Sequence, residues 1–364
     1  MASSTAPGPL VRLRGLRTEQ LPAATASPDE LAPFLLAILR EAVPFIDSAA
    51  PKAGNGAADP KIWKLKGSHA HPDSAAKIEV LERVVLPAAE LEKVAVSVGG
   101  GSSNKEKEKE KEKSKGKVRP ETWCCRRSVH EDKPERGTAS WDEFVRSFRD
   151  EHAESERAFT PACVDAHQAL AWDCGGAEAL EGGQTWGRFG LVVQEMRHRI
   201  GRPVLKDRTF PVLQMTATAT AGSTTTTTTS EEGEEEEEEE FLVVSIPIPD
   251  FGTSEASKLA KEKGAQIASY VSVERIRRIE GGDRDEDGGR KVEWLMATAS
   301  DAGGVLPGWV QNVAAPGVIW KDVPLFLGWI GRERVKRQQQ QGRDDDDDDD
   351  DGTNNAEDVA AGNT

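Results

Sequence analysis

The sequence predicts an α+β fold in which an antiparallel sheet wraps around a buried C-terminal helix. Helical periodicity occurs near both ends of the chain, and strand-like runs separated by turn residues fill most of the second half. The last apolar segment is apolar on nearly every side. Because such a helix must be buried, the strands are expected to form the layer that covers it.

Helices are expected in four places. The first begins at Ser27, where Ser-Pro-Asp precedes a segment with its apolar residues on one face. The second follows Ser140, because Ser140 and Glu143 have the spacing of a capping box. The third is expected over 161–172. The last covers 316–337, where Pro324 removes one hydrogen bond and should kink the helix.

Strands are expected between these helices, where β-branched and aromatic residues gather in short runs. The runs are 78–85, 122–130, 186–196, 208–216, 241–247, 267–279 and 292–300.

Several segments are too polar or too repetitive to bury a core. They are a loose N-terminal tail over 1–26, inserts at 99–117, 218–240 and 281–290, and an acidic tail over 338–364. Each insert separates or follows strand-like runs, and long surface loops cost little closure entropy. We therefore expect a single domain over 27–337 whose loops carry disordered inserts.

The net charge of −16 comes from two acidic runs. Nine glutamates lie between residues 231 and 240, and eight aspartates occupy 344–351; without them the net charge is +1. The nearly neutral remainder has no basic stripe of the kind that binds nucleic acid. No apolar run approaches the roughly 18 residues that span a bilayer.

Three segments resemble parts of START lipid-transfer domains, and they occur along this chain in the same order as in that family. Residues 292–296 (VEWLM) and 301–312 (DAGGVLPGWVQN) look like the last strand and final helix start of that family, and 206–210 (KDRTF) looks like its Arg-Asp-Phe step. The stretches 123–130, 195–198 and 319–330 look closer still to an uncharacterised, mainly fungal START-like family of unknown function. The resemblance implies a helix-grip fold, with a tunnel for a lipid or other apolar small molecule.

The resemblance implies an acidic tunnel residue, which Glu195 matches on a strand face shared with apolar side chains. Gln214 stands where the family has a basic partner, so Arg127 is an alternative partner. Both charged groups could instead reach solvent at strand ends. Arg208 belongs to the Arg-Asp-Phe-like step. His198 fits either a polar mouth for a headgroup or a solvated loop.

Trp309 and Trp320 could line the tunnel or pack in the core. No catalytic motif is found, and His69 and His71 lack a third metal ligand nearby, so neither a metal nor a cofactor is expected. The four cysteines have no CxxC spacing, which favours reduced thiols.

Two classes of function remain. The first is lipid binding, with transfer between membranes as its extension, by a cytoplasmic monomer that touches membrane surfaces transiently. The second is an interaction or scaffold protein with a filled helix-grip core. A cyclase or hydrolase is a weaker alternative. Arg12, Arg14 and Arg17 among leucines also leave a mitochondrial presequence open.

Overall fold

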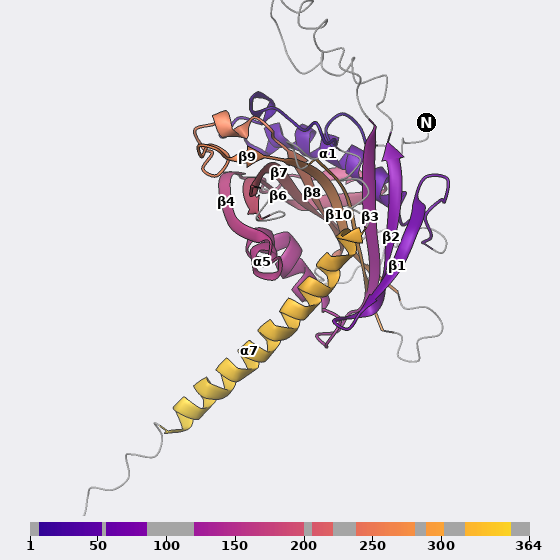
Figure 1. The fold of residues 1–364 in the computed structure, drawn as a ribbon, viewed down its shortest axis with the longest axis vertical. Coiled ribbons are helices and arrows are strands. Elements are labelled where there is room, and N and C mark those ends of the chain that lie inside the picture. The colour runs from indigo at the N-terminus through magenta and orange to yellow at the C-terminus, as the bar shows by residue number, and fades with distance from the viewer. Residues whose placement is uncertain are drawn as a thin grey trace, which may run out of the picture.

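A computed structural model gives the fold of the 364-residue chain (Figure 1). It describes residues 7–52, 56–85, 120–199, 206–220, 238–280, 289–301 and 317–350, with side chains up to residue 340. The predicted insert 99–117, Trp309 and the last residues of the acidic tail lie outside these ranges. So do most of the inserts 218–240 and 281–290.

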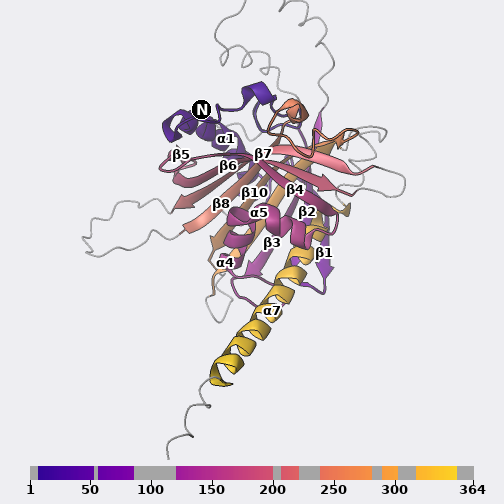
Figure 2. The same cartoon turned by 90° about the vertical axis from the view of Figure 1, so that its left-hand side faces the viewer.

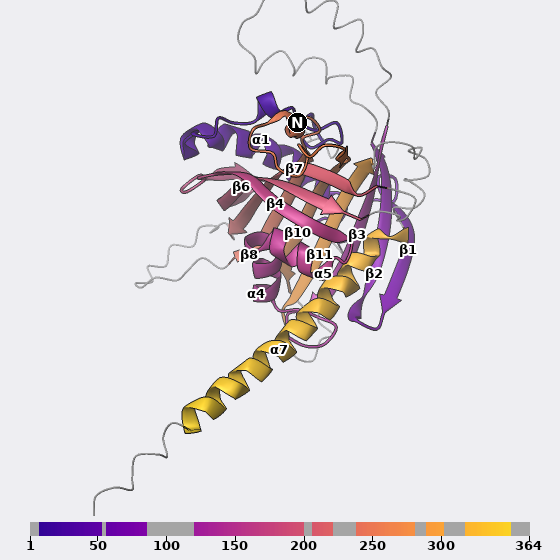
Figure 3. The same ribbon diagram turned by 60° about the vertical axis from the view of Figure 1, so that its left-hand side comes forward.

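The strands form one large, curved antiparallel sheet, as the sequence predicts (Figures 1 and 3). Within the described residues its order is β1-β2-β3-β11-β10-β8-β7-β6-β4, with the short β5 on β6 and β9 parallel to β7. The strands are β1 (Lys64–His71), β2 (Ser74–Val85), β3 (Glu121–Glu131), β4 (Cys163–Trp172), β5 (Ala179–Glu181), β6 (Gln184–His198), β7 (Arg208–Thr220), β8 (Glu238–Pro247), β9 (Gln266–Ile267), β10 (Ser269–Ile279) and β11 (Lys291–Asp301). Each predicted strand is therefore present, and β7 and β8 continue a few residues into the segment predicted as an insert.

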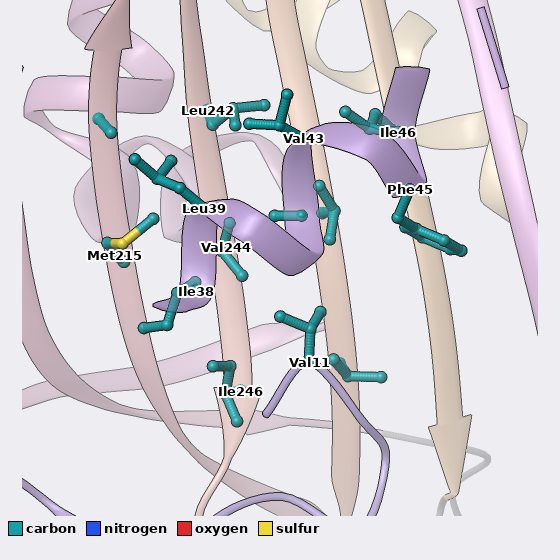
Figure 4. Packing of buried hydrophobic residues seen from close by; sticks show 14 of the residues in the cluster. Val11, Ile38, Leu39, Val43, Phe45, Ile46, Met215, Leu242, Val244 and Ile246 are labelled. Carbon is teal, nitrogen blue, oxygen red and sulfur yellow. The ribbon is translucent and has the colours of Figure 1, made fainter. Parts of the chain in front are cut away.

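Helix α1 (Pro28–Asp47) covers one side of the sheet, here called the α1 face (Figure 2). Its start follows the predicted cap, since the Ser27 N–H donates to the Glu30 carboxylate at 2.8 Å. Its apolar stripe packs on alternate residues of the strands, among them Met215, Leu242 and Val244 (Figure 4). The burial of this stripe against the sheet stabilises both elements.

Residues 7–26 also pack on the α1 face, so the prediction of a loose tail is wrong for this segment. Val11 and Leu16 are buried, and the N–H of Leu16 donates to the Pro247 carbonyl at 2.9 Å. Gly15 has a φ of +67°, and a Cβ there would lie 1.9 Å from the Pro247 carbonyl oxygen. Glycine is therefore required for this close approach.

Three short helical segments and one long helix cover the opposite side of the sheet, here called the α7 face (Figure 3). They are α4 (Trp141–Phe144), the π-helical η2 (Val145–Asp150), α5 (His152–Phe159) and α7 (Asp322–Asp350), the last preceded by the 3₁₀ turn η5 (Ile319–Lys321). The predicted capping box at Ser140 is present, since the Ser140 N–H donates to Glu143 at 2.9 Å.

The prediction of a helix over 161–172 is wrong, because Cys163–Trp172 form β4. This segment gains an antiparallel partner in β6 and ends the strand order of the sheet. Its alanines and its leucine fit a helix as well as a strand. The pairing with β6 decides between the two, and local sequence does not contain that information.

Helix α7 is the predicted C-terminal helix, with two differences. It begins at Asp322, so Pro324 is its third residue, where a backbone N–H has no intrahelical acceptor to lose, and no kink is required. It is buried on one side only, through Val323, Phe326, Leu327 and Ile330, whereas Val335 is 51% exposed. Beyond its first turns it extends away from the sheet as far as Asp350, within the segment predicted as an acidic tail (Figure 1).

Candidate functional site

A cavity of about 310 Å³ lies between the α7 face of the sheet and the helices α5 and α7. Six strands and both helices contribute to its lining, so it is built by the fold as a whole. The lining residues are Arg126, Phe148, His152, Glu156, Phe159, Thr160, His198, Phe210, Val243, Ser245, Tyr270, Ser272, Glu274, Met296, Thr298, Ser300 and Asp322.

One part of the lining is apolar, and the rest is rich in hydrogen-bonding groups. Phe148, Phe159, Phe210, Val243 and Met296 provide aromatic and aliphatic surface. Hydroxyl groups from β8, β10 and β11 and two sets of charged groups make up the remainder. A pocket of this kind suits a ligand that has an apolar body and a polar end.

The first charged set is centred on Arg126 of β3. Its guanidinium lies 3.9 Å from the ring centroid of Trp294, and its Nη2 donates to Glu274 Oε1 at 3.1 Å. The Trp294 indole N–H donates to the same carboxylate oxygen at 2.6 Å. Arg126 is 1% exposed, so this ion pair is fully inside the protein.

The second set joins α5 to the end of β6. Glu156 Oε2 lies 3.6 Å from His152 Nε2, and Glu156 Oε1 lies 3.7 Å from His198 Nε2. Burial alone would lower the pKa of His152, but the Glu156 carboxylate outweighs burial and raises it. The pKa of Glu156 is lowered, since the two histidines oppose the effect of burial.

Asp322, the first residue of α7, brings a third carboxylate to the cavity. Its Oδ2 lies 3.8 Å from Arg126 Nε, outside hydrogen-bonding distance. Burial raises the pKa of Asp322 to about 6, with Arg126 opposing the shift and Glu156 and Glu274 adding to it.

Of the site residues predicted from the sequence, His198 lines the cavity, where its ring also packs edge-on against Phe210. Gln214 and Arg208 lie on β7 and point to the α7 face, as their alternation with Leu213 and Thr209 requires, but neither is part of the lining. Arg208 is buried at the start of β7 and donates to the Lys206 carbonyl at 2.5 Å.

Glu195 lies on the α1 face, since it alternates with Gln194 and Met196 and follows the core residues Leu191 and Val193. Its carboxylate is 0% exposed and accepts hydrogen bonds from the Ser257 hydroxyl and the backbone N–H groups of residues 258, 259 and 260, at 2.7–2.9 Å. Burial would raise the pKa of Glu195, but these four donors lower it. The predicted contact with a ligand would have to compete with them.

Arg127 is also on the α1 face, and the predicted ion pair between Arg127 and Glu195 does not form. Arg127 Nη2 lies 2.7 Å from Glu293, and Nη1 lies 3.5 Å from Glu79. Four strands stand between β3 and β6 in the sheet, which separates the two residues.

Trp320 packs outside the cavity, at the β1 edge of the sheet. Its ring stacks on His69 at a centroid distance of 4.6 Å, and its indole N–H donates to the Gly317 carbonyl. In the described part of the chain, no three His, Cys, Asp or Glu side chains converge as a metal site. The four cysteines are buried thiols, and burial raises the pKa of Cys124, Cys125 and Cys163 to about 12.

Sequence reasoning missed the cavity because it followed the more apolar face of β6. Both faces of the sheet are buried, and the more apolar one packs against α1. The signal that marks the cavity is the opposite one: Tyr270, Ser272 and Glu274 alternate with the core residues Val271 and Val273 in β10. Buried polar residues on alternate strand positions need partners or a ligand.

The family described as "Protein of unknown function (DUF3074)" has a model that matches residues 123–330, more than half of the chain. The chain belongs to this family. The DUF3074 match runs from β3 into α7 and includes every residue that lines the cavity. Comparison with curated proteins found no match.

Solved structures similar to this DUF3074 chain include three human proteins. Human STARD10 is 13% identical over 84% of this chain and 84% of that chain, with a TM-score of 0.44. The human StarD13 (DLC2) lipid transfer and protein localization domain is 13% identical over 74% and 90%, with a TM-score of 0.36. Human StAR-related lipid transfer protein 5 is 9% identical over 75% and 86%, with a TM-score of 0.38.

Proposed function

We propose that this protein binds a lipid or another apolar small molecule in the cavity on the α7 face, without catalysing a reaction on it. The observation that supports this most directly is the cavity itself: about 310 Å³, lined partly by aromatic and aliphatic side chains and partly by polar groups. This volume lies at the lower end of the roughly 300–1,000 Å³ of small-molecule sites.

A non-catalytic role is supported by how the acid–base groups of the cavity are used. His152 and His198 both face Glu156, and Arg126 pairs with Glu274. A nucleophilic mechanism requires instead a hydroxyl or thiol within hydrogen-bonding distance of a base. Burial also raises the pKa of Tyr270, which keeps this phenol protonated.

The experiment is native mass spectrometry of the purified full chain, followed by extraction and analysis of bound small molecules. An apolar ligand at near-unit stoichiometry would support the proposal. A ligand-free protein that also fails to bind a fluorescent fatty acid or sterol would contradict it. Delivery of a bound lipid from donor to acceptor vesicles would extend the proposal to transfer.

A filled core with a scaffold function is the second candidate, and the aromatic cluster on the α7 face favours it. Phe144, Phe148, Trp294 and Phe326 pack with ring centroids 4.8–6.1 Å apart. This cluster occupies much of the space between the sheet and the helices. The ligand-free outcome described above, together with a stable protein partner, would favour this candidate.

We propose further that the protein is a cytoplasmic monomer that touches membrane surfaces transiently. No described helix is both long enough and apolar enough to cross a bilayer. Arg12 forms an ion pair with Glu121 at 3.2 Å, and Val11 is buried, which supports reading this segment as part of the domain instead of a presequence. Light scattering would test the monomer, and vesicle flotation the membrane contact.

A further inference from the structure

Arg126 has more hydrogen-bonding capacity than its neighbours use. Its Nη2 bonds to Glu274 and also lies 3.8 Å from the sulfur of Met296. Its Nε and Nη1 are buried and have no hydrogen-bond partner among the described residues. Since a guanidinium offers five N–H donors and buried donors are normally satisfied, the described part of the chain leaves Arg126 short of an acceptor.

The position of Arg126 connects this missing acceptor to the cavity. Arg126 lines the cavity together with Glu274, Met296 and Asp322. Its guanidinium carbon lies 3.9 Å from the ring centroid of Trp294, and Arg126 is 1% exposed, so its donors do not reach solvent. The Asp322 carboxylate lies 3.8 Å from Nε of Arg126, which is too far for a hydrogen bond, so it does not supply the missing acceptor.

The charged groups around Arg126 limit the kind of group that can supply the acceptor. Glu274 pairs with Arg126, and Glu156 faces His152 and His198. An anionic group would therefore add negative charge near three carboxylates, those of Glu156, Glu274 and Asp322. A cationic group would be repelled by Arg126 itself. An uncharged oxygen acceptor avoids both costs.

The volume of the cavity limits the size of the ligand. At about 30 Å³ for each water-sized group, 310 Å³ holds roughly ten such groups. This is enough for one short chain or a small ring system, and too little for a molecule with two long acyl chains. The apolar lining of Phe148, Phe159, Phe210 and Val243 suits the body of such a ligand.

We propose that the cavity takes a small, single-chain amphiphile whose polar end is an uncharged carbonyl or hydroxyl oxygen, and that Arg126 binds this oxygen through Nε and Nη1. This inference rests on the proposed binding function and specifies the chemistry of the ligand. Arg126 then acts as the hydrogen-bond donor that selects the polar end.

The test compares four probes that share a ten-carbon alkyl chain and differ in their polar end: 1-decanol, 2-decanone, decanoate and decylammonium. Each is titrated calorimetrically into the full-length protein. We expect decanol or decanone to bind at least roughly tenfold more tightly than either ion, because the ions add an unbalanced buried charge. Equal or tighter binding of decanoate or decylammonium would overturn the inference. If no probe binds, the inference fails, and the native mass spectrometry described above decides separately whether the proposed function stands, so the two failures are distinguishable.

The matched variant is Arg126→Met combined with Glu274→Gln, which removes the donor without leaving an unpaired carboxylate. It should bind decanol and decanone roughly tenfold less tightly than the wild type. Unchanged binding of these probes in a folded variant would overturn the role of Arg126. Arg127→Met, on the same strand but on the α1 face, should leave the affinities of all probes unchanged. If the double variant does not fold, the wild-type selectivity decides.

Asp322→Asn provides a further check on the charge argument. It removes one of the three carboxylates and should improve decanoate binding while changing decanol binding little. A loss of decanol binding would show that Asp322, and not Arg126, holds the polar end, and would overturn the assignment.

Discussion

Glu293 is the centre of a buried ion network on the α1 face. Its carboxylate lies 2.6 Å from Arg277 Nε, 2.7 Å from Arg127 Nη2 and 3.3 Å from Arg275 Nη2, and its side chain is 0% exposed. Burial would raise the pKa of Glu293, but the three guanidinium groups lower it. Arg275 continues the network to Asp47 at the end of α1. The carboxylate therefore connects three strands to the helix that covers them.

Replacing Glu293 with Gln should destabilise the fold by about 3 kcal/mol, because it leaves buried guanidinium groups without their counter-charge. The measurement is urea unfolding followed by circular dichroism. The control is Glu79→Gln, which removes a half-exposed carboxylate 3.5 Å from the same Arg127. That change should cost less than about 1 kcal/mol. Equal costs for the two variants would contradict the central position of Glu293.

The four hydrogen bonds accepted by Glu195 make a second prediction at the residue scale. Glu195→Leu should lower the free energy of unfolding by at least about 2 kcal/mol, since it removes the acceptor of four donors in the loop 257–260. Ligand binding in the cavity should change little. The opposite pattern, altered binding with unchanged stability, would show that Glu195 contacts the ligand as the sequence resemblance implies.

The lowered pKa of Glu195 adds a pH dependence to this contact. Because its folded pKa lies below the ordinary value of 4.5, the stability it contributes is present above pH 4.5. That contribution is lost as the pH falls through the folded pKa. The protection factors of the amides of residues 258–260, which correct for the slower intrinsic exchange of any amide in acid, should therefore fall in acid for the wild type. In Glu195→Gln, exchange should already be faster at neutral pH and should lack this acid transition.

At the scale of elements, the sequence indicates the strands and the helix caps well, because these depend on local chemistry. Ser27 and Ser140 both form the predicted caps, and each predicted strand is found. The errors concern elements whose state depends on distant partners. Residues 163–172 become β4 only through pairing with β6, and α7 is buried only where it meets the sheet and α5. The sequence predicts the strand of Glu195 correctly, whereas the tunnel position comes from the family resemblance, because no local pattern shows which face α1 covers.

Helix α7 is held at its middle by Arg334. The guanidinium lies 2.5 Å from the Glu143 carboxylate and donates to the carbonyl groups of Glu135 and Thr138 at 2.6 and 3.0 Å. Glu143 also belongs to the capping box of α4, so one carboxylate joins two helices. Burial would raise the pKa of Glu143, but Arg334 and Ser140 lower it.

Arg334→Ala should destabilise the protein by about 1.5–3 kcal/mol, the usual range for hydrogen bonds to a charged group. Because the Arg334 side chain is partly exposed, we expect the lower end of this range. Thermal unfolding measures the change. Lys336→Ala is the control, because Lys336 is exposed and pairs only with Glu333 one turn away among the described residues. It should change the free energy of unfolding by less than about 0.5 kcal/mol. A chain that ends after residue 337 should likewise keep the wild-type stability.

At the scale of the whole molecule, the sheet separates two different interiors. The α1 face is a continuous apolar core with an ion network at its border. The α7 face combines an aromatic cluster, which packs the base of α7, with the cavity and its buried polar groups. Both faces of the sheet therefore carry a core, and the space for a ligand lies on the α7 face. This division allows the cavity to vary without loss of the fold.

Filling the cavity tests this division directly. Ser272 lines the cavity from β10, and Ser272→Phe should place a ring in the space proposed for the ligand. Overpacking costs about 1–3 kcal/mol, which the α1-face core should tolerate. A ligand at 100 times its dissociation constant stabilises a binding protein by about 2.7 kcal/mol. Decanol at saturating concentration should therefore raise the Tm of the wild type and leave the Tm of Ser272→Phe unchanged. An equal rise in both proteins would place the binding site elsewhere, and no rise in either would favour the filled-core scaffold.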